Sequence, residues 1–224
     1  MPIDGPDNSG KVNRTGGRGS DADANPFGEL NPLAAQAIDP ERVGGDLYRD
    51  KTTGIYLLAR DPTRDNFHGK GNGTLCLARD GWRIPKETLL VSADYIATAT
   101  PWSESGIGID EEMAATIRQA AQAAGISDLA FFRSSGYEDS AGHTAAGLYS
   151  SKPQFLNISN ELLSFTIMEV VNSGFSWPAQ AFNEKHGHET KPIAMCIQQA
   201  QCSPELKAQG RFAPHWSFVV DSSH

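Results

Sequence analysis

The stretch Asp110-Glu-Glu-Met-Ala-Ala-Thr-Ile-Arg-Gln-Ala-Ala-Gln-Ala-Ala-Gly125 begins with acidic residues, is rich in alanine and ends in glycine. Acidic side chains stabilise the N-terminus of a helix, alanine is the best helix former, and glycine commonly follows the last helical residue. The next apolar run, Asp128-Leu-Ala-Phe-Phe-Arg133, has the composition of a strand. A helix followed at once by a strand predicts a fold that combines helices with a sheet.

Other short apolar runs bounded by turn formers predict further strands. They are Gly54 to Ala59, Thr74 to Arg79, Thr88 to Ala93 and, closing the sheet, His215 to Val220. The glycine-containing segment from Asp61 to Gly73 predicts a loop. A second loop, from Ser135 to Ser151, has the Gly, Ser and His content of a segment that could line a site.

Further helices are predicted in the second half of the chain. Asn160 to Asn172 is apolar around most of its circumference, so we expect it to be the central buried helix. Prolines suited to a first helical turn predict short helices from Trp177, from Pro192 through Cys196, and from Ser203 to Gly210. The expected fold class is α+β: a single domain with a small mixed or antiparallel sheet packed on several helices.

The first part of the chain has a different composition. Residues 1–45 are rich in Gly, Asp, Asn, Ser and Pro, with Phe27 as the only aromatic residue. Such a segment buries too little apolar surface to offset its chain entropy. We therefore expect a flexible, disordered N-terminal tail over residues 1–45 and the α+β domain over residues 46–224.

Overall charge and hydropathy exclude some classes of function. The 224 residues carry a formal net charge of -8, with a pI of about 5.2, so a nucleic acid gains no long-range attraction. The longest apolar stretch, Leu162 to Val171, contains Glu169 and falls short of the roughly 20 residues that span a bilayer. The first residues lack the apolar core of a signal peptide. We expect a cytoplasmic protein without a membrane span, and any secretion to use a signal-peptide-independent route.

A cysteine nucleophile is the first candidate for chemistry. Cys196 lies near the start of the helix expected from Pro192, where unpaired N–H groups lower the pKa of a thiol. Its base is either His68, in the glycine-rich loop, or His215, with Asp221 downstream. The alternative interpretation is that Cys196 is a small buried hydrophobic residue, since Ile197 and other apolar residues surround it.

Two of these segments carry a family resemblance. A histidine before an early strand, followed late in the chain by a helix headed by the cysteine in Pro192-Ile-Ala-Met-Cys196-Ile-Gln-Gln-Ala, resembles circularly permuted NlpC/P60 papain-fold hydrolases. Type VI secretion amidase effectors are similar in length. The resemblance implies Cys196 as nucleophile, His68 as base, a peptide or cell-wall substrate such as peptidoglycan, and an immunity or partner protein. Ile197 replaces the usual small polar residue after the cysteine.

Other groupings of reactive residues are weaker. Cys76 paired with His215 is better explained by core packing of the cysteine, and the spacing of His186, His188, Cys196 and Cys202 is unlike a zinc site. We expect no metal and no cofactor. His68-Gly-Lys-Gly-Asn-Gly-Thr74 resembles a phosphate loop, but a strand is expected after it, which leaves only anion binding by the glycine amides near Lys70 open.

The function predicted from the sequence is a cysteine-dependent hydrolase of amide or ester bonds. The alternative is a non-catalytic effector or protein-binding module that contacts a partner through Trp102, Tyr137 and Trp177. A third hypothesis is an ADP-ribosyltransferase-like enzyme, because Leu47-Tyr-Arg49 and Val91-Ser-Ala93 are similar to elements of that group. The glutamate motif of that group is not recognisable.

Overall fold

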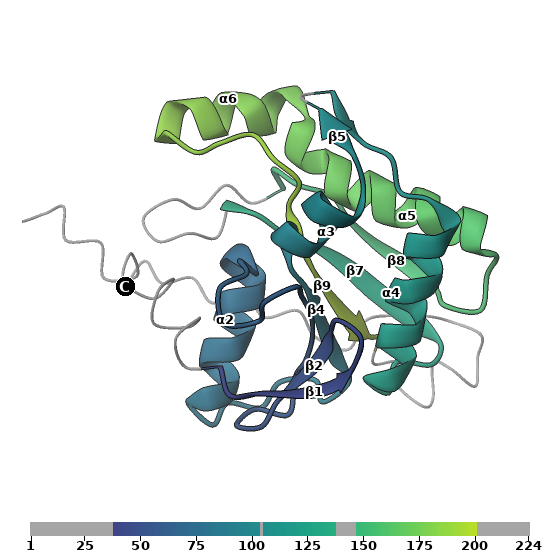
Figure 1. Cartoon of the computed structure of the whole chain (residues 1–224). Helices are drawn as coiled ribbons and strands as arrows, with labels where there is room; N and C mark the ends of the chain where they lie inside the picture. The colour runs from purple at the N-terminus through teal and green to yellow at the C-terminus, as the bar shows by residue number, and fades with distance from the viewer. Residues whose placement is uncertain (1–37, 104, 138–146, 201–224) are drawn as a thin grey trace, which may run out of the picture.

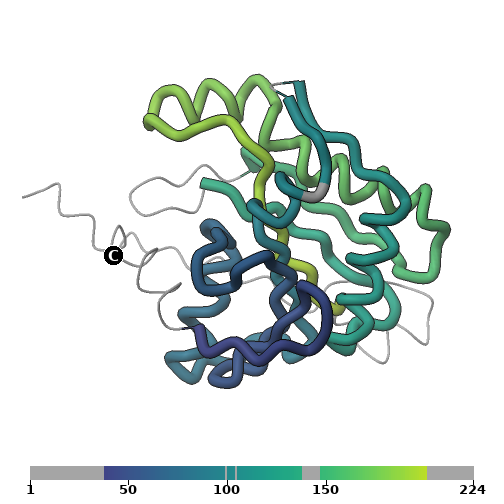
Figure 2. The backbone as a smooth tube through the Cα atoms, viewed as in Figure 1, coloured from purple at the N-terminus to yellow at the C-terminus, as the bar shows by residue number. Residues whose placement is uncertain are grey.

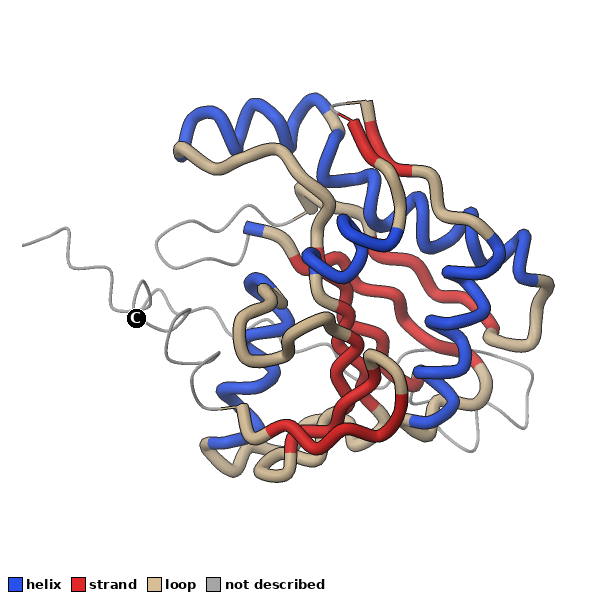
Figure 3. Tube along the Cα trace, viewed as in Figure 1, coloured by secondary structure: helices blue, strands red, loops and turns tan. Residues whose placement is uncertain are grey.

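The computed structural model describes residues 38–103, 105–137 and 147–200. Within these ranges the protein has the expected α+β architecture, with a seven-stranded mixed sheet as its central layer and helices on both faces (Figures 1 and 3). No helix in the described ranges is long and apolar enough to cross a membrane.

The sheet has the order β1-β2-β3-β4-β9-β7-β8. Its strands are β1 (Pro40–Gly44), β2 (Leu47–Asp50), β3 (Tyr56–Leu58), β4 (Thr88–Val91), β7 (Leu129–Ser135), β8 (Ser151–Phe155) and β9 (Ala194–Gln199). Strands β3 and β4 are parallel, and every other neighbouring pair is antiparallel. A separate two-stranded ribbon joins β5 (Trp102–Ser103) to β6 (Gly106–Ile107).

Five α-helices surround the sheet in the described part of the chain. They are α2 (His68–Arg79), α3 (Ala93–Ala99), α4 (Glu111–Ala123), α5 (Asn160–Asn172) and α6 (Trp177–His186), with the 3₁₀ helix η3 (Ser173–Phe175) between the last two. Helix α2 is the crossover between the parallel strands β3 and β4, a connection that can be followed in the backbone trace (Figure 2). It covers one face of the sheet, whereas α4 and α5 lie together on the other (Figure 1).

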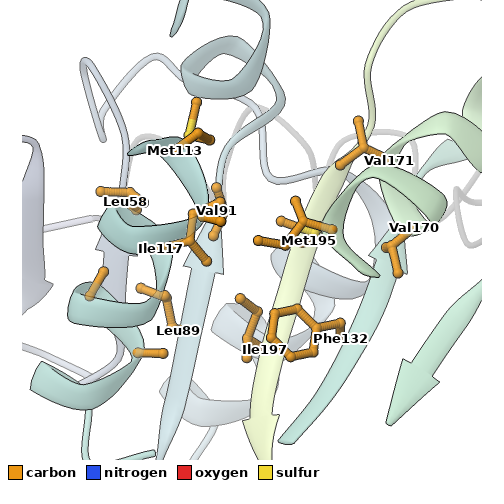
Figure 4. Packing of buried hydrophobic residues seen from close by; sticks show 14 of the residues in the cluster. Leu58, Leu89, Val91, Met113, Ile117, Phe132, Val170, Val171, Met195 and Ile197 are labelled. Atoms are coloured by element: carbon orange, nitrogen blue, oxygen red, sulfur yellow. The ribbon is translucent and has the colours of Figure 1, made fainter. Parts of the chain in front are cut away.

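Period-two alternation divides the core between the two faces of the sheet. Met195 and Ile197 of β9 point toward α4 and α5, into the larger cluster shown in Figure 4. Cys196 lies between them on the chain and points the other way, into the smaller cluster that includes Leu75 of α2. Because both faces of β9 are covered, its first four residues are all buried.

The strongest sequence signals are confirmed. The Asp110 side chain caps α4 by accepting a hydrogen bond from the Met113 N–H at 2.8 Å, and Ser159 caps α5 in the same way. The predicted helices at Asn160 and Trp177 and the predicted strands before Ala59, at Thr88 and at Asp128 are present. Each combines a recognisable cap or boundary with a hydrophobic pattern of one period.

Two secondary-structure predictions are wrong. Thr74 to Arg79, predicted to be a strand, is the second half of helix α2, where Leu75 is buried but Leu77 is 47% exposed. Pro192 to Cys196, predicted to be a helix, leads into strand β9 instead. In both places tertiary packing overrides a short local signal, since an apolar run this short suits either structure.

Two expectations about organisation also differ from the structure. Strand β1 (Pro40–Gly44) pairs with β2, so ordered structure begins inside the segment expected to be tail. Helix α5 is buried along one face only, because Leu162 and Phe165 are 55% and 50% exposed. The predicted helix from Ser203 and the predicted strand from His215 lie outside the described residues.

Candidate functional site

The first turn of helix α2 is opened by a serine from the neighbouring strand. The Gly71 N–H donates to the Ser135 hydroxyl at 2.8 Å, and that hydroxyl donates to the Phe67 carbonyl at 2.6 Å. In an ordinary helix the Gly71 N–H would bond directly to the Phe67 carbonyl. Ser135, at the end of β7, is therefore inserted into the helical hydrogen-bond ladder and ties α2 to the sheet.

Two glycines allow this close approach. A Cβ on Gly71 would lie 2.8 Å from the Cβ of Phe67, and a Cβ on Gly136 would lie 2.3 Å from the Tyr149 ring. The Gly136 carbonyl also accepts a hydrogen bond from the Gly69 N–H at 3.1 Å. This backbone bond and the Ser135 bridge join the end of β7 to the start of α2, and neither Gly71 nor Gly136 has room for a side chain.

The loop before α2 is fixed from the opposite side. The Asp65 carboxylate, which is buried, accepts hydrogen bonds from the Arg60 N–H and the Ser92 hydroxyl, each at 2.8 Å. Burial raises the pKa of Asp65 in spite of these bonds. Asn66 donates its N–H to Asp94 and accepts the N–H of His68 on its side-chain oxygen at 2.7 Å. These bonds fix the position of His68, the first residue of the helix.

That residue, His68, has two unusual features. Its φ is 51°, which makes it the only residue other than glycine with a positive φ in the described ranges. Its side chain is 1% exposed, yet neither imidazole nitrogen has a hydrogen-bond partner among the residues that the structure describes. A strained backbone and an unpartnered buried polar group each cost about 1–3 kcal/mol. The hydrogen bonds of Asn66 and Gly136 hold the strained backbone, but in the described part of the chain no group satisfies the ring nitrogens.

Three side chains lie around the imidazole. The Tyr137 ring meets it edge to face, with ring centroids 4.7 Å apart. The Tyr137 ring also stacks on the ring of His188, with ring centroids 4.2 Å apart and an interplanar angle of 3°. Lys191, three residues further along the same segment, is close enough to act on His68 electrostatically. Tyr137, His188 and Lys191 are all partly exposed, so they connect the buried ring to the surface.

The environment holds His68 neutral. Burial, together with the smaller effects of the positive charges of Lys191 and His188, lowers the pKa of His68 to about 3. A neutral imidazole presents one N–H donor and one acceptor nitrogen. It is a weak base at neutral pH, but its N–H can polarise an oxygen of a bound molecule.

Cys196, the predicted nucleophile, lies in the middle of a fully covered strand. It is 0% exposed, and burial raises the pKa of its thiol to about 11. The raising effect of burial is only partly offset by the opposite effects of Arg133, Thr74 and Lys70. The predicted activation by a helix N-terminus is wrong because Cys196 is in β9, and the structure instead favours the alternative of a small buried hydrophobic residue.

The predicted partners of Cys196 are not brought to it. His68 makes no hydrogen bond to the thiol, since both of its nitrogens are unpartnered. His215 and Asp221 lie outside the described residues. The late helix on which the NlpC/P60 resemblance depended is a strand, so that resemblance stays a prediction without structural support.

The remaining predicted groups are dispersed. In the described ranges no three His, Cys, Asp or Glu side chains are grouped to hold a metal ion. His186 contacts the ring of Phe182, while Cys76 is partly buried on α2 and burial raises the pKa of its thiol. Cys202 lies outside the described residues.

The aromatic residues predicted to contact a partner occupy two places. Trp177 is 80% exposed at the start of α6, and Trp102 is 42% exposed with its ring 6.0 Å from Phe175. Tyr137 belongs to the surroundings of His68 instead. The protein-binding module stays a prediction, because nothing in the described structure indicates what would cover the tryptophans.

Sequence reasoning found His68 but missed how it is held. Ser135 and Tyr137 fell in a segment recognised as a loop that could line a site, whereas Lys191 had no signal of its own. The sequence argues against a phosphate loop at His68 to Thr74 because a strand is expected after it, but these residues are the beginning of helix α2, so the loop predicted over Asp61 to Gly73 is wrong from His68 onward. A histidine before alternating glycines at a helix start was the available signal.

Comparison of the chain with protein families, with curated proteins and with solved structures finds no match. The geometry around His68 is therefore the basis for assigning a function.

Proposed function

We propose that this protein binds a small polar ligand at the start of helix α2, with the imidazole of His68 as its principal hydrogen-bonding group. One observation carries the proposal: a buried imidazole with both nitrogens unpartnered, on a residue whose backbone is in the left-handed region. Costs of this kind persist where the surrounding structure enforces them, and they concentrate at functional sites. A bound ligand would supply the missing hydrogen bonds.

The surroundings of His68 suit such a role. Ser135, Gly71 and Gly136 fix the backbone on both sides of the imidazole, so its position is set before a ligand arrives. Preorganisation of this kind lowers the entropic cost of binding. The partly exposed rings of Tyr137 and His188 offer flat apolar surface beside the polar group, which is the usual composition of a ligand site.

The chemistry available at the site is polarisation of a ligand oxygen by the N–H of a neutral imidazole. This is compatible with the amide or ester hydrolase predicted from the sequence, but that activity is untested and Cys196 is not placed to take part in it. Ligand binding is the function that the described contacts support directly.

The test is a fragment titration monitored by the side-chain resonances of His68. Protein containing isotope-labelled histidine is titrated with three classes of fragment at millimolar concentration, each class separately. The first class is carboxylates and phosphates, the second is neutral amides and sugars, and the third is amines. We expect at least one class to shift the His68 ring resonances in a saturable way, and the binding of that class, measured by calorimetry, to be lost in His68→Phe. His186→Phe, which alters a partly buried histidine of α6, is the matched control and should leave binding unchanged.

A failure has a clear signature. If no class of fragment shifts the His68 resonances while the protein remains folded, the strained imidazole is a structural feature and the proposed binding function is wrong.

A further inference from the structure

Among the residues that the structure describes, the two charges that act on the pKa of His68 are both positive, and they come from Lys191 and His188. The N-terminus of α2 adds the positive end of its helix dipole, and no acidic residue lies in its first turn. The nearby carboxylates of Asp65 and Asp94 lie before the helix, where they accept hydrogen bonds from Arg60, Ser92 and Asn66. The imidazole itself is therefore exposed to positive potential.

We infer that the ligand group recognised at His68 is an oxyanion, a carboxylate or phosphate, held between the imidazole N–H and the ammonium group of Lys191. The inference rests on the proposed binding function and names the chemical class of its ligand. It joins two independent observations: a 12-residue helix with no acidic residue in its first turn, and an imidazole at that end that is 1% exposed and has no hydrogen-bond partner among the described residues.

Side chains, not glycine amides, are the donors in this site. The Gly69 N–H is already bonded to the Gly136 carbonyl, the Gly71 N–H to Ser135, and the His68 N–H to Asn66. The binding mode therefore differs from a phosphate loop, in which successive backbone N–H groups surround the anion. The imidazole N–H and the Lys191 ammonium provide the charge-assisted hydrogen bonds instead.

Lys191 belongs to a segment whose backbone packs against the 3₁₀ helix η3. A Cβ on Gly174 of η3 would lie 2.8 Å from Cγ2 of Ile193 and 3.4 Å from the carbonyl oxygen of Lys191. Pro192 and Ile193 are buried, so the segment packs closely on η3 while the Lys191 side chain stays partly exposed. The lysine is thus attached to a fixed backbone beside the imidazole and is accessible to a charged ligand.

An anion at this position should change the ionisation of His68. A negative charge beside the imidazole favours its protonated form, so the pKa of His68 rises on binding. The groups that face the imidazole are Tyr137 from the end of β7, and His188 and Lys191 from the segment before β9, while Lys70 is the nearest charged residue along α2 itself. Glu138 and Asp139, which follow Tyr137, lie outside the described residues.

The experiment measures the binding of inorganic phosphate and of acetate to the full chain by calorimetry at pH 6, and follows the His68 ring resonances through a pH titration with and without each anion. We expect saturable binding and an upward shift of the His68 pKa in the bound state. Lys191→Gln should weaken binding roughly tenfold or more, because one charge-assisted hydrogen bond is lost. Lys191→Arg should retain most of the affinity.

The matched control is Lys185→Gln, which removes the same charge from an exposed lysine of α6. If this variant weakens phosphate binding as much as Lys191→Gln does, or if neither anion shifts the His68 resonances, the oxyanion assignment is overturned. A shift caused by neutral amides but not by anions would overturn this inference alone and leave the proposed binding function intact. If no class of fragment shifts the His68 resonances, both the oxyanion inference and the proposed binding function are wrong.

Discussion

At the scale of single residues, His68 carries the clearest thermodynamic signature in the protein. The folded state keeps its imidazole neutral, with a pKa of about 3, while the same side chain in the unfolded chain titrates near its ordinary value of 6.5. Between these two values the unfolded chain binds a proton that the folded chain does not. Stability from this source is complete above about pH 6.5 and is lost as the pH falls toward 3.

The prediction is that His68→Phe flattens the pH dependence of stability. In the wild type, the free energy of unfolding should fall between pH 6.5 and pH 4.5 by up to about 1.4 kcal/mol per pH unit from this residue. The phenylalanine ring has no proton to bind, so that contribution disappears. Urea unfolding at several pH values measures both slopes, and their difference isolates His68 from the other titrating groups. Equal slopes would show that His68 titrates normally in the folded protein.

Cys196 gives a second prediction at this scale. Because its thiol is 0% exposed and burial raises its pKa to about 11, iodoacetamide should leave it unmodified in the native protein at pH 8. It should react at once in denaturant. Cys76, which is partly exposed, is the internal control and should react faster in the native state. Mass spectrometry of the labelled peptides reads both sites, and rapid native labelling of Cys196 would restore it as a candidate nucleophile.

At the scale of elements, helix α2 shows how one helix can contain glycines with opposite effects. Gly71 faces the Phe67 side chain, whereas a Cβ on Gly73 would meet nothing within 4 Å. Glycine in a helix costs roughly 0.5–1 kcal/mol relative to alanine unless close packing requires it. The two positions therefore separate helix propensity from packing within one turn.

We predict that Gly73→Ala stabilises the protein by roughly 0.5–1 kcal/mol and that Gly71→Ala destabilises it by about 1–3 kcal/mol. The first substitution reduces the entropy of the unfolded chain, while the second forces a Cβ to within 2.8 Å of the Phe67 Cβ. Thermal and urea unfolding of both variants measure the effects. If both substitutions stabilise, Gly71 is not packed against the Phe67 side chain as described.

At the scale of the whole molecule, the sheet begins earlier in the chain than its composition suggests. Ile38 is 7% exposed in the cluster between α2 and the sheet, and the Asp50 carboxylate accepts the Asp39 N–H at 3.0 Å. Strand β1 then covers the edge of β2. These contacts make residues 38–44 part of the domain.

A pair of truncations tests this boundary. A chain beginning at residue 46, the boundary expected from composition, should be less stable than one beginning at residue 38 by about 2 kcal/mol or more, because it loses the buried Ile38 side chain and the β1 pairing. Urea unfolding of the two purified chains gives the difference. Equal stability would place the boundary at residue 45 after all.

The sequence by itself determined the features that depend on neighbours along the chain. Asp110 and Ser159 cap their helices through hydrogen bonds to residues three positions away, so the order of residues alone locates α4 and α5. The α+β class followed from the same local signals. Each of these interactions forms within one turn, which is why it can be predicted without knowledge of the packing.

Only the tertiary structure decided the site. The opened first turn of α2 depends on the Ser135 hydroxyl, which is 68 residues away in sequence from the Phe67 carbonyl that it bonds. The stacking of Tyr137 on His188 likewise joins two segments that no sequence periodicity relates. The same long-range packing made Cys196 part of a covered strand instead of a helix start. Contacts between distant segments depend on how the whole sheet assembles, so the residues around His68 could be recognised one by one but not as a group.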